Sequence, residues 1–244
     1  MVALFALTAH LCPAEAEVEG GFAKVQSLVT AYAQTQGGEA AVGNLFGSEV
    51  SGTLKEEERS WEFVMWKRSP AQSRRLVKQS QGNFIQVFDG GKGWQRLPGR
   101  RDFEEVPRRE LPLMAFRSHP VSPLLTAFKR GTRIEFTGTA VVDGRTCNIL
   151  EFDDNRMGHV VYFLDSRRHL PIRVDLVPRN TALAQTTLTY GRYRTVDGRL
   201  LPFHITIRRG TLRQEEIIDT ISTNPGVIPT IFELPDDEVS TNSR

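Results

Sequence analysis

Histidine, cysteine and acidic side chains carry most protein chemistry, and in this sequence they are scattered. The five histidines occur singly, without the spacing to a cysteine or carboxylate that a metal site uses: His10, His119, His159, His169 and His204. The sequence contains neither a Gly-x-Ser-x-Gly elbow nor a His-Glu-x-x-His motif. We therefore predict no catalytic residues, no metal site and no cofactor.

One glycine-rich stretch superficially resembles a phosphate-binding loop. Residues 89–93 read DGGKG, but they lack the Gly-x4-Gly-Lys-Ser/Thr spacing and lead into Trp94 and a strand-like pattern. The acidic pairs at 153–154 and 236–237 fall in a predicted turn and a polar tail, where such residues serve turn geometry and solubility. A tight hairpin is the better interpretation of residues 89–93.

The overall charge excludes one class of partner. A formal net charge of +2 over 244 residues gives no nucleic-acid footprint. Arginines are locally dense, and solvated surface is a more common role for such a run than anion binding: Arg96, Arg100, Arg101, Arg108, Arg109 and Arg117. Cys147 lies in an apolar strand pattern without a nearby base, so we interpret it as a small core residue.

The most informative stretch, residues 59–97, predicts four antiparallel strands in succession. Apolar residues alternate along it, and turn signals at 69–70, 81–82 and 89–91 separate the strands. Trp61, Phe63 and Met65 share one face of the first strand. Bulky aromatic residues on one face require a covering layer or a concave space.

The preceding residues predict a leader and two helices. Residues 1–16 resemble a signal peptide, because the apolar run at 2–11 is too short to span a bilayer and Ala14-Glu15-Ala16 suits a cleavage site. A helical face runs through residues 20–35 and comprises Phe22, Val25, Leu28, Val29 and Tyr32. A short helix at 39–45 and a strand at 47–54 follow.

Residues 98–128 interrupt the strand pattern. They contain five of the thirteen prolines, so no long regular element can run through them. Apolar residues between the prolines predict short helices or loops that form either a movable lid or a permanently packed crossover. We leave both interpretations open.

The strand pattern resumes after residue 133. Turn signals, among them Asp143-Gly144 and Asp197-Gly198, separate a further series of strands. We predict these strands at residues 133–142, 146–152, 159–164, 172–177, 184–193, 201–209 and 214–222. With no helical segment between them, they indicate an antiparallel meander. We expect one domain over residues 17–235 and a flexible tail over 236–244.

Several motifs in this order resemble the LolA-like superfamily of outer-membrane lipoprotein-sorting proteins. They are a glycine pair after the first helix, a strand containing Gly52, FDGGKGW at 88–94, VDGRTCNILEF at 142–152, YFLDSRRHLPIRVD at 162–175, YGRYRTVDGRLLPFHI at 190–205 and NPGVIPTIFELP at 224–235. The resemblance implies a curved antiparallel sheet that forms an incomplete, half-open barrel covered by a few short helices. It also implies a periplasmic location and an apolar cavity for a lipid or lipoprotein acyl chain.

With this resemblance, the aromatic face becomes a candidate binding surface. Burying an acyl chain releases about 0.8 kcal/mol per methylene. Our predicted cavity walls are Trp61, Phe63, Met65, Phe84, Phe88 and Trp94, and our predicted lid residues are Leu113, Met114 and Phe116. Each could instead be ordinary core.

Three hypotheses follow. The first is a non-enzymatic periplasmic carrier for lipoprotein sorting or lipid transfer, with inner- and outer-membrane transport proteins as partners. The second is a binding module in which lipid occupancy regulates a protein partner in an envelope stress pathway. The third is an enzyme whose residues converge only in three dimensions.

Overall fold

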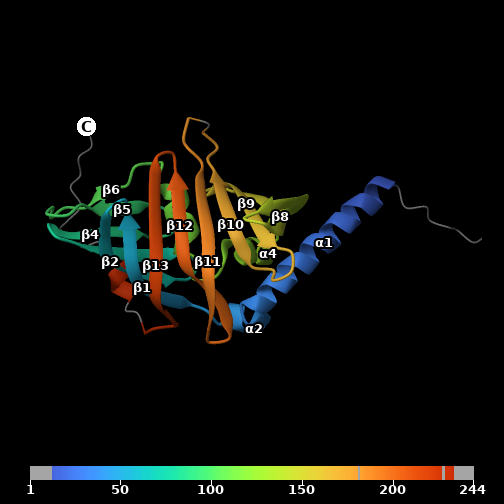
Figure 1. Ribbon diagram of the computed structural model, residues 1–244, viewed down its shortest axis with the longest axis horizontal. Coiled ribbons are helices and arrows are strands. Elements are labelled where there is room, and N and C mark those ends of the chain that lie inside the picture. The colour runs from blue at the N-terminus through green and yellow to red at the C-terminus, as the bar shows by residue number, and fades with distance from the viewer. Residues whose placement is uncertain (1–12, 181, 227–228, 234–244) are drawn as a thin grey trace, which may run out of the picture.

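A single antiparallel sheet dominates the protein. The computed structural model describes residues 13–180, 182–226 and 229–233. Its 13-stranded sheet has the order β6-β5-β4-β3-β2-β1-β13-β12-β11-β10-β9-β8-β7. The sheet is not closed, because β6 and β7 are its two edges (Figure 1). The predicted half-open sheet architecture with a few helices is confirmed.

The strands and helices have the following bounds. The strands are β1 Gly47–Glu56, β2 Arg59–Arg68, β3 Gln72–Gln79, β4 Gly82–Phe88, β5 Gly93–Arg96, β6 Glu104–Glu105, β7 Glu135–Val142, β8 Arg145–Asp154, β9 Gly158–Asp165, β10 Pro171–Val177, β11 Thr186–Val196, β12 Arg199–Arg209 and β13 Leu212–Thr223. The helices are α1 Pro13–Thr35, α2 Gly38–Gly43, α3 Leu111–Ser118 and α4 Pro123–Lys129, with a 3-10 turn at Pro229–Phe232.

Local turn chemistry explains why these strands form hairpins. In the β7–β8 turn Asp143 and Gly144 have φ angles of 47° and 73°, and in the β11–β12 turn Asp197 and Gly198 have 47° and 75°. Two successive positive φ angles are the type I′ geometry that joins strands of right-handed twist. The two Asp-Gly turn predictions are therefore confirmed, as are the strands on either side of them.

The pairing of β1 with β13 joins two runs of hairpins into one sheet. Its register shifts at Ser51 and Gly52, where a bulge bends the strand. A Cβ on Gly52 would collide with the backbone oxygen of Ile217. Only glycine allows this close approach, which brings the first strand beside the last.

Helix α1 covers one end of the sheet and continues past it. Val25, Leu28, Val29 and Tyr32 are buried in the main core, as the predicted helical face requires. Phe22 was predicted on that face but is 64% exposed. Figure 1 shows the reason: the amino-terminal part of α1 projects away from the body of the protein. Phe22 has no sheet surface to pack against.

Other sequence predictions fall partly outside the described residues. In the predicted signal segment only residues 13–16 are described, where they form part of α1. The predicted tail at 236–244 lies entirely outside them. Residues 98–128 contain only short elements, as their prolines require. In the part of the chain that is described, none of the helices combines the length and hydropathy needed to cross a bilayer.

The core has three parts. The largest lies between β8–β12 and helices α1, α3 and α4 and contains Leu150, Tyr162 and Leu164. A second lies on the inner face of β1–β3, β12 and β13 and contains Phe63 and Met65. The third is a small cluster of Ile85, Val87 and Phe103 with Leu76 and Trp94 beside it.

Candidate functional site

A cavity of about 180 Å³ lies where the helices meet the inner face of the sheet. The helices contribute residues to its wall, among them Tyr32 of α1 and Phe116 of α3. The apolar and aromatic residues of the wall include Tyr32, Val42, Leu45, Val50, Met65, Phe116, Val121, Tyr162, Leu188, Tyr190, Ile205, Ile218 and Ile221. Charged residues also line it: Lys67, Arg117, Arg199 and Glu216. The site therefore combines hydrocarbon surface with a charged region.

Tyrosines give part of the wall an amphipathic character. Burial raises the pKa of Tyr32 to about 12, and it raises the pKa values of Tyr162, Tyr190 and Tyr193 well above their ordinary value. Tyr193 donates its hydroxyl proton to the backbone oxygen of Pro171. Because these phenols stay protonated, they offer ring surface and neutral hydrogen bonds, and they supply no base at neutral pH.

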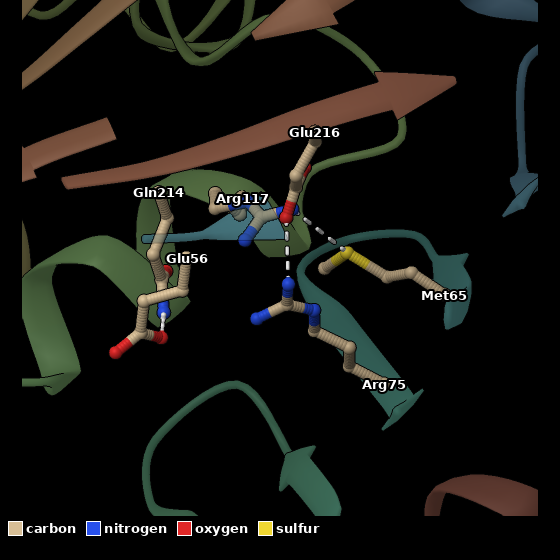
Figure 2. A network of polar contacts seen from close by, with 6 residues as sticks. All are labelled: Glu56, Met65, Arg75, Arg117, Gln214 and Glu216. Carbon is tan, nitrogen blue, oxygen red and sulfur yellow. Dashed lines mark hydrogen bonds and ion pairs between the residues drawn. The ribbon is translucent and has the colours of Figure 1, made fainter. Parts of the chain in front are cut away.

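Glu216 is the centre of a buried ion-pair network. It lies on β13, is 1% exposed, and accepts a hydrogen bond of 2.7 Å from Arg75 of β3. Arg117 of α3 contacts both of its carboxylate oxygens, at 2.6 and 2.7 Å (Figure 2). The same guanidinium lies 3.8 Å from the Met65 sulfur. This network ties the helix α3 to two separate strands.

Opposing effects set the protonation of this network. Burial favours a protonated Glu216, but the charges of Arg117 and Arg75 outweigh it and hold the carboxyl pKa below its ordinary value. Burial lowers the pKa of Arg75 to about 10, although Glu216 partly offsets it. At neutral pH the network consists of one carboxylate and two guanidinium groups.

Lys67 lies beside this network without an ion-pair partner of its own. It is half-buried on β2 and lines the cavity. Burial lowers its pKa to about 8, Arg117 contributes to the lowering, and Glu216 opposes it. Among the described residues, its ammonium forms neither a hydrogen bond nor a direct ion pair.

A second cavity of about 200 Å³ lies on the other side of the network. Its lining includes Met65, Arg75, Phe84, Gln86, Leu113, Met114, Arg117 and Gln214. Met65 and Arg117 line both cavities. The Arg117–Glu216 ion pair therefore stands between two hollow regions of the inner face.

Metal binding finds no support in the described part of the chain. None of its groups of histidine, cysteine, aspartate or glutamate is suitably placed to hold an ion. The thiol of Cys147 is fully buried, as predicted, and burial raises its pKa. This makes Cys147 a core residue.

Comparison with proteins of known structure identifies the fold. No family model and no curated protein matches the sequence. Among solved structures, a domain from Vibrio parahaemolyticus named for outer membrane lipoprotein sorting superposes with a TM-score of 0.59 at 14% identity, covering 88% of this chain and 97% of that one. A LolA superfamily protein from Nitrosomonas europaea gives a TM-score of 0.59 at 11% identity, covering 85% and 96%. The chain has a LolA-like fold.

A third similar structure extends this result. A DUF1329 family protein from Desulfovibrio piger superposes with a TM-score of 0.57 at 13% identity, covering 86% of this chain and 97% of that one. At such identities the likeness concerns the fold, since unrelated functions share folds. The resemblance inferred from the ordered motifs is confirmed at that level.

The LolA-like fold brings most of the predicted site residues to one face of the sheet. Met65 and Phe116 line the first cavity. Met65, Phe84, Leu113 and Met114 line the second. Their assignment to ligand binding remains a prediction.

Three other predicted wall residues share that inner face without lining either cavity. Phe63 is buried in the second core cluster and Phe88 in the largest, while Trp61 packs at the margin of the second cluster. These residues therefore belong to the core that surrounds the cavities. They pack against core side chains, so a molecule in either cavity would not contact them directly.

Trp94 lies on the opposite face of the sheet. It pairs with Val87 across the β4–β5 hairpin, and Phe88 pairs with Gly93. Side chains alternate along a strand, so Trp94 shares the face of Val87 and not that of Phe88. The inner position goes to Gly93, where an added Cβ would press against Val106, Leu111 and Met114. Trp94 is thus not placed as a wall of either cavity.

The charged residues of the site were not among the predicted ones. Arg117 belongs to the arginine run interpreted as solvated surface, yet its side chain is only 11% exposed. Two signals in the sequence could have identified the other charged residues of the site. Lys67 continues the alternation of Trp61, Phe63 and Met65, and Glu216 shares the parity of Ile218 on β13.

Proposed function

We propose that the protein is a non-enzymatic periplasmic carrier that holds an acyl chain of a lipid or lipoprotein between its helices and its sheet. The observation that carries this proposal is the aromatic and aliphatic lining of the cavity in a LolA-like fold. Such a lining removes hydrocarbon from water, with a gain of about 0.8 kcal/mol per methylene. The tyrosines and charged residues leave one region suited to a polar group.

The size of the cavity bears on how a chain is loaded. At about 180 Å³ it is smaller than the roughly 300–1,000 Å³ of clefts that enclose drug-sized ligands. The neighbouring cavity of about 200 Å³ is separated from it by Met65 and Arg117. A long acyl chain therefore requires a displacement of α3 or of the Arg117 side chain, and Leu113, Met114 and Phe116 would move with that helix.

Lipid content of the purified protein tests the carrier. We expect organic extraction and mass spectrometry to recover an acyl lipid in a fixed ratio to protein. Val50 lines the cavity from β1, so Val50→Trp should fill it and reduce the lipid recovered at least tenfold. Val64 lies on the other face of the adjacent strand, which makes Val64→Trp the matched control.

The result that would overturn the carrier is equally specific. If folded Val50→Trp retains as much lipid as wild type and Val64→Trp, the cavity is not the lipid site. A wild-type protein that neither copurifies with nor binds any acyl lipid would reject the proposal outright.

A further inference from the structure

The wall of the first cavity carries a surplus of positive charge. Its charged side chains are Lys67, Arg117 and Arg199 against the single carboxylate of Glu216. Glu216 is already shared between Arg117 and Arg75. His119 also lines the wall, but burial and the charge of Arg130 lower its pKa to about 4, so it is neutral at pH 7.

Arg199 does not remove this imbalance. Its guanidinium is buried and donates to the backbone oxygens of Ala41 and Asp197. Its Nε has no hydrogen-bond partner in the described structure. These acceptors are neutral carbonyls, so Arg199 remains a cation without a carboxylate of its own.

Lys67 has a polar setting that faces the cavity. Across the strands, Ser48 pairs with Lys67 on one side and with Thr223 on the other. Directly paired residues share a face of the sheet, so one ammonium and two hydroxyls form a row, and all three residues line the cavity. Thr223 already donates its hydroxyl proton to the carboxylate of the exposed Asp197, so Ser48, which pairs directly with Lys67, supplies the hydroxyl beside the ammonium.

Lys67 is half-buried and has no ion-pair partner of its own, although the more distant Glu216 attracts it. Removing a charge from water without a partner disfavours the folded state, and the usual remedies are a counter-ion or loss of the proton. The pKa of Lys67 is lowered only to about 8, so the ammonium remains mostly charged at pH 7. A bound anion would supply the missing partner.

We propose that Lys67, with Ser48 beside it, binds the anionic group of an amphiphile whose hydrocarbon chain lies against Val50, Leu188 and Ile205 in the same cavity. This inference rests on the proposed function and specifies its ligand class. A fatty-acid carboxylate and a phospholipid phosphate share the required chemistry. An uncharged acyl group alone would leave Lys67 unpaired.

Calorimetric titration of the full chain tests this with three probes of equal chain length: oleic acid, oleoyl lysophosphatidic acid and oleyl alcohol, each below its micellar concentration. We expect at least one anionic probe to bind ten or more times as tightly as the alcohol. Lys67→Met should abolish that preference while leaving the affinity for the alcohol within about twofold. Lys78→Met is the control, because Lys78 is an exposed cation on β3 paired with Glu62.

The outcomes separate the two proposals. A preference for the lysophosphatidate over oleic acid assigns a phosphate head group, and the reverse assigns a carboxylate; both support the inference. If the alcohol binds as tightly as the anions, or if Lys67→Met weakens all three probes equally, the head-group site is rejected and the carrier stands. If no probe binds, the head-group site is rejected, and the carrier fails as well when no acyl lipid copurifies with the protein.

Discussion

The two halves of the sheet's inner face solve the problem of burial differently. Beneath α1 and α4, strands β8–β10 present a surface without buried charges, with Leu150, Val160 and Leu164 fully buried and Asn148 and Tyr162 as its polar residues. Beneath α3, strands β3 and β13 present Arg75 and Glu216 at comparable burial. The alternation of side chains along a strand thus determines which face of the sheet a residue occupies. It does not determine whether the residue on that face is apolar or charged.

The difference extends to how the helices are attached. Polar contacts hold α3 along its length: Ser118 to Ser73 at 2.6 Å, Arg117 to Glu216 at 2.6 Å, and Glu110, just before the helix, to Arg209 at 2.6 Å. By contrast, α1 is held by Val25, Leu28 and Val29 in the main core. Polar contacts are directional, so α3 has a defined position in this structure in addition to the packing of its own Leu113, Met114 and Phe116 in the main core.

Removing the central carboxylate is the strongest test of the charged half. Glu216→Gln leaves Arg75 and Arg117 buried without an anion, and breaking a buried ion pair costs about 3–5 kcal/mol. Urea denaturation at pH 7 measures the loss. Glu215→Gln on the same strand is the control, because its pair with the exposed Arg213 contributes at most about 1 kcal/mol.

The pH dependence of that loss identifies its cause. The folded-state pKa of Glu216 lies below its ordinary value of 4.5, so its stabilisation is complete above pH 4.5 and disappears as the pH falls through the folded pKa. Wild type and Glu216→Gln should converge in acid. A difference that stays constant with pH would show that packing, not charge, is lost.

A cavity mutation tests the apolar half. Leu164 on β9 is fully buried, and Leu164→Ala should lower the free energy of unfolding by about 2–5 kcal/mol. Because only hydrocarbon is removed, this loss should not vary between pH 4 and pH 7. Val141→Ala on the exposed edge strand β7 should cost less than about 0.5 kcal/mol in the same assay.

The sequence was sufficient for the strands and their order of connection. Alternation bounded by Asp-Gly and Gly-Gly turns located β2–β5 and β7–β13 to within a few residues, because each turn type demands its own residues. The pairing of β1 with β13 joins residues 160 to 175 positions apart. No local pattern encodes that contact, and only the structure shows it.

The sequence predicted which face of the sheet carries most of the site residues, but it did not predict the charged residues among them. Phe84, Phe88 and Met65 lie on the inner face because parity is preserved within a strand. Parity was lost across the β4–β5 turn, which put Trp94 on the other face. Lys67 and Glu216 were missed because we assumed charged residues to be solvated. Only the three-dimensional structure shows the surroundings in which they lie.

The smallest expected difference between the charged and the apolar half of the inner face concerns Lys67. Its folded-state pKa of about 8 is below the ordinary value of 10.5, so the folded state gives up this proton more readily than the unfolded state. Stability from this group therefore rises as the pH increases from 8 to 10.5. The stability advantage of Lys67→Met over wild type should be greatest at pH 7 and should shrink across that interval, as measured by urea denaturation without ligand. Tyrosine ionisation affects both proteins alike and cancels in the difference. An advantage that is absent at pH 7 would mean that water or a protein group already compensates the ammonium, and the charged half would then be as self-sufficient as the apolar one.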